Sequence, residues 1–242
     1  MRPPTASAML AAWERGLDQD PVERGLTLLA LACPEADREG LAELSIGERG
    51  RRLLALRGTV FGPHLTGLID CAACGETLEL DIAAADLSAA PRPDAAGLAV
   101  CISGYALELR LPDSHDLAAS AAADPTAAKA VLLRCCIVAA SCGGQALETQ
   151  DLPADTVDAI ARRLSEADPQ ADLHLALVCA GCGHQWRAAF DIVPFLWTEL
   201  DAWAARALQE VHFLAAAYGW SERDILGLGP ARRRRYLRML GA

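Results

Sequence analysis

Apolar residues near the start of the chain recur at the spacing of an α-helix. In residues 8–32 they lie three or four positions apart, with one interruption at Asp20-Pro21. Aspartate accepts hydrogen bonds from the free N–H groups at a helix start, and proline fits the first helical turn. We therefore predict two helices, the second capped by Asp20. Residues 41–56 continue the helical pattern. We expect the arginines within that stretch to form a solvated face: Arg49, Arg51 and Arg52.

Two stretches far apart in the chain alternate between apolar and polar residues, which is the pattern of half-buried strands. The first covers residues 65–70 and 77–82, and the second covers residues 172–178 and 185–192. In both stretches the alternating runs are separated by a short turn that contains Cys-x-x-Cys-Gly. The pattern therefore predicts two β-hairpins, each with a pair of cysteines at its tip.

The cysteine spacing at these tips indicates a metal site. A Cys-x-x-Cys-Gly turn places two thiolates on one side of a tight loop, because glycine accepts the positive φ that turns backbone amides toward the sulfurs. Two such turns supply the four ligands of a tetrahedral zinc ion. We therefore predict one structural zinc ion per chain, held by Cys71, Cys74, Cys179 and Cys182.

Other uses of these cysteines stay open. A thioredoxin-like redox pair opens a helix after a strand, whereas the residues after each pair here alternate like a strand. Disulfides require an oxidising compartment, and the sequence before Trp13 has no apolar core of a secretory signal. Between Cys74 and Cys179 lie 104 residues, where an ordinary zinc ribbon has about 15–20. His64 and His184 are alternative ligands, although a loop position and a supporting contact explain them as well.

Between the two hairpins the hydrophobic pattern changes several times. In chain order it predicts a loop over 83–97, a strand over 98–111, a turn over 112–116, a helix over 124–141 and a helix over 153–167. The helix that begins after Asp124 is predicted because aspartate can cap it and Pro125 suits its first turn. Gly143-Gly144 is expected to end it.

After the second hairpin the pattern is helical again. One amphipathic stripe runs over residues 196–218 and predicts a long helix that ends at Gly219. Ser221, followed three residues later by Asp224, is typical of a helix start and predicts a short helix over 221–226. A last helix is expected over 231–240, where five arginines gather.

The order of these elements predicts an α+β fold. Helical N- and C-terminal segments surround two zinc-knuckle β-hairpins, which share one four-cysteine, zinc-ribbon-like site, and a mixed strand and helix insertion separates the knuckles. The predicted parts are the N-terminal helical segment (1–57), the first knuckle hairpin (58–82), the insertion (83–170), the second knuckle hairpin (171–194) and the C-terminal helical segment (195–242).

Composition narrows the class of function. The 242 residues include 22 basic and 32 acidic side chains, and this net charge of −10 argues against a general nucleic-acid binder. Apolar residues make up 52% of the chain, but no apolar run reaches the length of a membrane span. Nine cysteines without a secretory signal indicate a cytoplasmic protein with reduced thiols. Scattered histidines, with no phosphate-binding loop and no nucleophile motif, indicate a protein that is not an enzyme and takes no small-molecule substrate.

The C-terminal segment mixes aromatic side chains with arginines, the residue types enriched at interface hot spots. Its run of arginines is explained either as a solvated helix end whose charge complements the helix dipole, or as a docking surface for an acidic partner. The candidate partner-binding residues are Tyr218, Trp220, Arg232, Arg233, Arg235 and Tyr236.

Three groups of residues together resemble a known family. The first is Gly-x-x-Leu-x-Gly-x-x-x-Cys-x-x-Cys-Gly over 62–75, and the second is Cys-x-x-Cys-Gly-x-x-Trp over 179–186. The third and most specific is His…Tyr-x-Trp-Ser-Glu-x-x-Ile-Leu…Arg-Arg-Arg-x-Tyr-Leu within 210–237. Over roughly residues 10–240 the chain resembles the T-even-type baseplate hub assembly chaperone family, which occurs in contractile phages and in phage-derived contractile injection systems.

The resemblance implies a non-enzymatic assembly factor or structural component of the baseplate or hub of a contractile phage tail or injection system. Its partners would be other baseplate or hub proteins, without nucleic acid or membrane. The alternative is a zinc-ribbon protein associated with nucleic acid or transcription, which a basic patch beside the cysteines would favour. The residues found there are acidic and argue against it: Asp70, Glu76, Glu79, Asp81 and Asp191.

Overall fold

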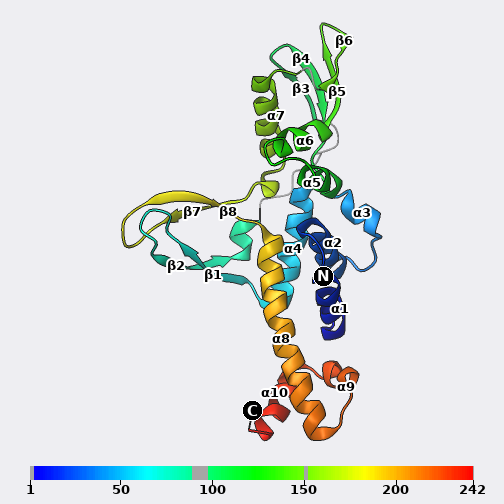
Figure 1. Cartoon of the computed structure of the whole chain (residues 1–242), viewed down its shortest axis with the longest axis vertical. Coiled ribbons are helices and arrows are strands. Elements are labelled where there is room, and N and C mark those ends of the chain that lie inside the picture. The colour runs from blue at the N-terminus through cyan, green and yellow to red at the C-terminus, as the bar shows by residue number, and fades with distance from the viewer. Residues whose placement is uncertain (1–2, 89–97, 150–151, 242) are drawn as a thin grey trace.

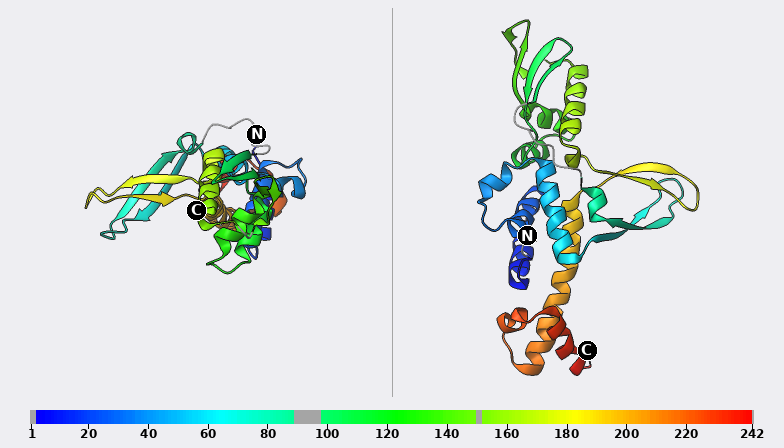
Figure 2. Two further views of the ribbon diagram at one scale, coloured as in Figure 1. Left: turned by 90° about the horizontal axis from the view of Figure 1, so that it is seen from above. Right: turned by 180° about the vertical axis from the view of Figure 1, so that it is seen from behind.

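The structure is a computed structural model that describes residues 3–88, 98–149 and 152–241. Figure 1 shows an elongated molecule with a long helix in its lower half, other helices beside that helix, and hairpins that project to one side. A small sheet with its own helices lies at the upper end, and short helices lie at the lower end. The rotated views in Figure 2 show the same projection of the hairpins away from the body. The predicted α+β class is confirmed.

The first, second and fourth helices of the chain pack beside the long helix α8, and the third packs on the second. The bounds of these helices are α1 (Ala6–Gly16), α2 (Pro21–Ala32), α3 (Arg38–Ala42), α4 (Ile46–Phe61) and α8 (Ile192–Tyr218). The predicted break is confirmed: Asp20 accepts hydrogen bonds from the first-turn N–H groups of Val22 and Glu23, and α2 begins at Pro21. The largest fully buried side chains shared by these helices are leucines, among them Leu28, Leu29, Leu53, Leu54, Leu56 and Leu200.

The predicted solvated face of arginines is wrong for Arg49, which is only 6% exposed. Helix α4 contacts α2, α8 and the short 3-10 helix η3 (Pro169–Ala171), so little of its surface faces solvent. Burial lowers the pKa of Arg49. Arg51 and Arg52 remain partly exposed, and both pair with Glu48 on the same helix.

A bidentate ion pair fixes α4 against α8. Arg57 donates from Nε to Glu199 Oε2 at 2.9 Å and from Nη2 to Glu199 Oε1 at 2.6 Å, and its Nη1 donates to the carbonyl of Gly62 at 2.8 Å. The side chain of Arg57 is 3% exposed. Removing one member of such a pair leaves the other charge poorly compensated, so the pair constrains how the two helices pack.

Both predicted hairpins are confirmed. Strand β1 (His64–Asp70) pairs antiparallel with β2 (Thr77–Ala83), and β7 (His174–Val178) pairs antiparallel with β8 (Gln185–Ala189). Half-buried side chains alternate with exposed ones along β2, β7 and β8. Each hairpin therefore has one covered face and one face open to solvent.

In the insertion, the single strand predicted over 98–111 is wrong. The structure has two strands there, β3 (Leu98–Ile102) and β4 (Tyr105–Leu109), which pair antiparallel. Ser103 and Gly104 form the turn between them with φ values of 52° and 86°. Positive φ at both positions is typical of a type I′ two-residue hairpin turn, and serine is an uncommon choice for the first of them.

The helix predicted over 124–141 is wrong at both ends. It begins only at Ala128, after Ala127 and without a side-chain cap, and Asp124 instead accepts hydrogen bonds from the backbone N–H and the hydroxyl of Thr126. Helix α6 (Ala128–Cys135) ends early, and β5 (Ile137–Cys142) follows and pairs with β4. Gly143-Gly144, expected to end a helix, instead turns β5 into the short β6 (Gln145–Ala146), with φ values of 56° and 81°. The sheet order is β3-β4-β5-β6.

Two further helices complete the insertion. Helix α7 (Ala154–Ala167) matches the prediction for 153–167, and its Ile160 is fully buried in a core shared with the sheet. Helix α5 (Ser114–Ala121) lies where a turn was predicted over 112–116, because Asp113 and Asp116 form a reciprocal capping box. Of the loop predicted over 83–97, the structure describes only 83–88. Ala83 ends β2 there, and Ala84–Leu87 form a 3-10 helix.

Asp168, at the end of α7, joins the insertion to the N-terminal helices. Its buried carboxylate accepts a hydrogen bond from the backbone N–H of Gly47, in the first turn of α4, at 2.9 Å. The negative charge lies at the positive end of the helix dipole, where it is stabilising. A side chain at position 47 would collide with this carboxylate, since an added Cβ would lie 1.8 Å from Asp168 Oδ1.

The C-terminal elements follow the sequence pattern closely. Helix α8 ends at Gly219, which has a φ of 69°. Ser221 caps α9 (Glu222–Gly227), and its side chain accepts a hydrogen bond from the backbone N–H of Asp224. Helix α10 (Pro230–Met239) folds back along the end of α8.

Candidate metal centre and C-terminal surface

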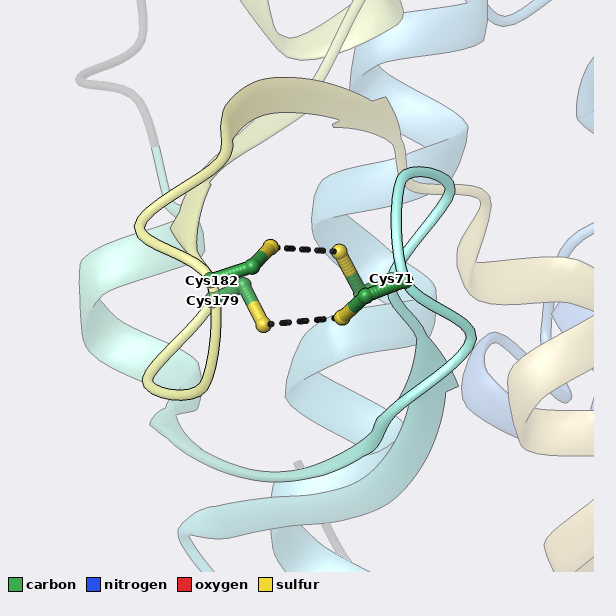
Figure 3. Close-up of side chains that lie close together, drawn as sticks. Cys71, Cys179 and Cys182 are labelled. Carbon is green, nitrogen blue, oxygen red and sulfur yellow. Dashed lines mark hydrogen bonds between the residues drawn. The ribbon is translucent and has the colours of Figure 1, made fainter.

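The two hairpin tips bring four cysteine sulfurs together. The Sγ atoms of Cys71, Cys74, Cys179 and Cys182, hereafter the four-cysteine cluster, all lie within 4.8 Å of one another. Cys71 lies 3.7 Å from Cys182, and Cys74 lies 3.6 Å from Cys179. Figure 3 shows the sulfurs of the two loops pointing toward each other across the gap between the hairpins. The insertion therefore does not separate the two halves of the predicted site.

Backbone hydrogen bonds shape the two loops in the same way. The N–H of Gly75 donates to the carbonyl of Cys71 at 2.8 Å, and the N–H of Gly183 donates to the carbonyl of Cys179 at 2.9 Å. Both glycines have positive φ, 75° and 71°, and an added Cβ would meet nothing within 4 Å. Glycine is therefore required at these two positions by the positive φ of the backbone and not by a lack of space for a side chain, as the Cys-x-x-Cys-Gly motif predicts.

The spacing of the sulfurs fits a tetrahedral metal ion. Zinc–sulfur bonds of about 2.3 Å in a tetrahedron place neighbouring sulfurs about 3.8 Å apart, close to the two distances found. A disulfide needs about 2.0 Å, and all four cysteines are free thiols. Four thiolates arranged in this way suit zinc or iron. The residues present therefore fit a tetrathiolate metal centre.

The environment of the cluster favours thiolates at one position in particular. Burial alone would raise the pKa of Cys71, but hydrogen bonds from the backbone N–H groups of Cys74 and Ala73 outweigh it and lower the pKa to about 7. The sulfurs are unequally accessible: Cys71 and Cys179 are buried, whereas Cys74 and Cys182 are exposed. The cluster thus has an inner and an outer pair of ligands.

Glu76, next to the first cysteine loop, also reaches the second one. Its Oε2 accepts a hydrogen bond from the Sγ of Cys179 at 3.5 Å, and a Cβ added to Gly181 would lie 1.8 Å from the same oxygen. Gly181 therefore leaves room for a cross-loop contact. Nothing in the sequence pattern singles out Glu76 for this position, because the contact depends on how the two hairpins meet.

The two histidines considered as ligands have other partners. His184 stacks on Trp186 with ring centroids 5.6 Å apart, and Nδ1 of His64 lies 2.8 Å from a carboxylate oxygen of Asp81. Within the described residues, the cluster of side chains close enough to hold a metal consists of the four cysteines.

At the far end of the molecule, three of the candidate partner-binding residues form an aromatic cluster. Tyr218 stacks on Trp220 with ring centroids 4.7 Å apart, and Tyr236 meets Trp220 edge-on at 4.9 Å. These contacts join the end of α8, the turn after it and α10. The aromatic side chains therefore hold the C-terminal helices together, and Tyr218 remains 37% exposed.

The arginines of α10 divide into two groups. Arg233 is 5% exposed, donates to Glu210 Oε2 of α8 at 2.7 Å and donates to the carbonyl of Leu228 at 2.9 Å. It therefore anchors α10 and offers little surface to a partner, which differs from its predicted role. The remaining candidates on this helix, Arg232 and Arg235, are exposed.

The fold and the four-cysteine cluster define an α+β protein in which two hairpins, distant in sequence, meet at four cysteines close enough to hold a metal ion. No helix in the described part of the chain is long and apolar enough to cross a membrane. Residues 9–197 match the family described as T4 bacteriophage base plate protein, and the chain belongs to that family. Comparison with curated proteins and with solved structures found no match.

The family match confirms the resemblance to a T4-type baseplate family. It covers both cysteine pairs and ends before the C-terminal string within 210–237. Membership places the protein among baseplate-related structural proteins and implies contacts with other baseplate proteins.

Proposed function

We propose that the protein is a non-enzymatic assembly factor or structural component of the baseplate or hub of a contractile phage tail or contractile injection system. Membership of the T4 baseplate protein family over residues 9–197 is the observation that carries this proposal. The work of such a protein is to recognise surfaces of other baseplate proteins. Its shape suits that work, because the hairpins, the small sheet and the C-terminal helices extend in different directions (Figure 1).

In this proposal the four-cysteine cluster holds one structural zinc ion. The sulfur spacing of 3.6–3.7 Å and the matched backbone turns support zinc as the occupant. A bound zinc would tie the two hairpins together by supplying folding free energy. Each hairpin alone has only two strands, which is marginal for stability in water.

The candidate contact surface for a baseplate partner is the C-terminal segment. Its exposed members are Tyr218, Arg232 and Arg235, while Trp220 and Tyr236 are half-buried and support them. Aromatic and guanidinium groups that lie side by side are typical of interface hot spots.

Deletion of the gene tests the assembly role. Electron microscopy of the deletion strain should show free tubes and sheath subunits without complete particles, and the wild-type gene should restore them. A gene that carries Cys74→Ser should restore complete particles poorly, because the two hairpins would not fold without the metal ion. Normal contractile particles in the deletion strain would refute the proposal.

The finished particle distinguishes the two forms of the proposal. A structural component should be present in purified particles at a fixed ratio to the tube protein. An assembly chaperone should be present in lysates of assembling cells and absent from purified particles. Quantitative mass spectrometry of both samples makes the distinction.

A further inference from the structure

Charge is distributed unevenly along this acidic chain. Residues 219–242 contain six arginines and two acidic residues, although the whole chain has a net charge of −10. The first hairpin and its cysteine loop, residues 64–83, contain four acidic residues and neither lysine nor arginine. The same molecule therefore has a basic C-terminal end, residues 219–242, and an acidic first hairpin, residues 64–83.

The basic end presents arginines that have no acidic partner. Arg233 alone among the α10 arginines forms an ion pair within the described residues. The others are exposed on α10, namely Arg232, Arg234, Arg235 and Arg238. At the end of this helix, Met239 is 64% exposed and Leu240 is 40% exposed. The helix therefore offers guanidinium groups next to an uncovered apolar tip.

The open face of the first hairpin has the complementary character. Leu68 is 71% exposed, the highest value among the large apolar side chains of the described residues, and Glu79 lies directly opposite it in the strand register. Asp81 lies on the same face two positions further along β2, and it pairs with His64. Within the described part of the chain, Glu79 forms no ion pair. The face thus combines carboxylates with an uncovered leucine.

One molecule cannot bring these two surfaces together. Helix α8 begins beside the hairpins and carries α10 near its other end, and its 27 residues span about 40 Å. Figure 1 and the right-hand view in Figure 2 show the hairpins and α10 in separate parts of the molecule. A contact between the two surfaces must therefore join two copies.

We propose that α10 of one copy docks on the open face of the β1–β2 hairpin of a second copy. The guanidinium groups of Arg232 and Arg235 would pair with Glu79 and Asp81, since arginine and carboxylate form strong bidentate contacts. The apolar tip of α10 would cover Leu68. The contact is head-to-tail, so repetition produces a closed ring or an open filament.

This proposal names a partner for the C-terminal surface assigned above and rests on that surface role. Its test uses purified protein alone, so that its failure leaves the baseplate role standing. Sedimentation velocity of the full chain should show concentration-dependent association at low salt. The association should weaken from about 0.1 M to about 1 M salt, as the screening length falls from about 10 Å to about 3 Å.

Charge reversal identifies the surfaces. The double variant R232E/R235E and the double variant E79K/D81K should each raise the dissociation constant about tenfold or more. An equimolar mixture of the two should associate again, because each reversed surface then meets its complement on the other variant. The matched control R134E/R162E reverses two exposed arginines of the insertion and should associate like the wild type.

Three results would overturn the proposal. The first is a wild-type chain that stays monomeric at every concentration and salt. The second is association that neither double variant weakens, and the third is a mixture that fails to associate although both variants are folded by circular dichroism. If the monomeric wild type instead binds duplex DNA and R232E/R235E does not, then α10 binds nucleic acid and the second copy is excluded as its partner.

Discussion

Replacing Gly47 with alanine should destabilise the protein, although alanine is the better helix former. Gly47 lies in the first turn of α4, where its backbone N–H donates to the buried carboxylate of Asp168 at 2.9 Å. An added Cβ would lie 1.8 Å from Asp168 Oδ1 and 2.4 Å from its Cγ, so the carboxylate must move away. The substitution therefore breaks the contact that joins the insertion to α4.

The magnitude follows from opposing effects. Alanine in place of glycine favours a helix by about 1 kcal/mol. Loss of a hydrogen bond to a charged group costs about 1.5–3 kcal/mol, and loss of a carboxylate at a helix N-terminus costs about 0.5–1 kcal/mol more. The expected net loss in free energy of unfolding is about 1–3 kcal/mol, which lowers the melting temperature by roughly 3–10 °C in a chain of this size.

Gly58 provides the matched control, because it lies in the same helix and an added Cβ would meet nothing within 4 Å. Gly58→Ala should raise the melting temperature, whereas Gly47→Ala should lower it. In the Asp168→Ala background, Gly47→Ala should lose most of its penalty. Thermal and urea unfolding followed by circular dichroism measure all three effects. If Gly47→Ala stabilises the protein as much as Gly58→Ala does, then the hydrogen bond between Gly47 and Asp168 does not contribute to stability.

Three other predictions concern buried groups and the metal centre. Arg57→Met should lower the free energy of unfolding by about 3 kcal/mol in urea titrations, because it leaves Glu199 without its bidentate partner; an unchanged titration midpoint would contradict the role of this pair. Burial raises the pKa of the Cys136 thiol from 9.0 to about 12, so its contribution to stability is complete below pH 9 and is lost as pH rises toward 12. Wild-type stability should therefore fall more steeply between pH 9 and pH 11 than that of Cys136→Ala, by about 2 kcal/mol over this range, and parallel pH profiles would exclude this effect. Cys74→Ser should abolish zinc binding and lower the melting temperature, whereas Cys101→Ser, at an exposed cysteine outside the cluster, should change stability by less than about 0.5 kcal/mol; equal effects of the two would speak against a structural metal.

The hairpins and helix ends were predictable because their signals are local. Each cysteine loop carries its own glycine, and Asp20 and Ser221 lie next to the N–H groups that they cap. The four-cysteine cluster was predictable for the same reason, since each half of it is a complete motif. How far apart the halves lie in sequence does not matter once both hairpins form.

The insertion was mispredicted where one pattern fits two structures. The apolar residues around Cys136 and Ile137 suit a buried helix or a buried strand, and periodicity alone does not separate these over a short run. The structure is decided by pairing of β5 with β4, a contact between separate segments. The turn at Ser103-Gly104 was missed because serine rarely adopts the positive φ of 52° found there.

Buried arginines were missed for a related reason. Arg57 and Arg233 look like solvated residues in a sequence, yet each is buried against a carboxylate on α8, Glu199 or Glu210. Their partners lie 142 and 23 residues away along the chain. Such pairs become visible only when the packing of the helices is known.

Metal analysis combined with thiol alkylation decides whether one zinc ion joins the two hairpins. Protein purified under reducing conditions without chelator should contain one zinc ion per chain. Cys74 and Cys182 should resist alkylation although they are exposed, while the exposed Cys101 and Cys142 react, and a strong chelator should remove the difference. Metal-free protein in which Cys74 and Cys182 react as fast as Cys101 would show that no zinc ion joins the hairpins.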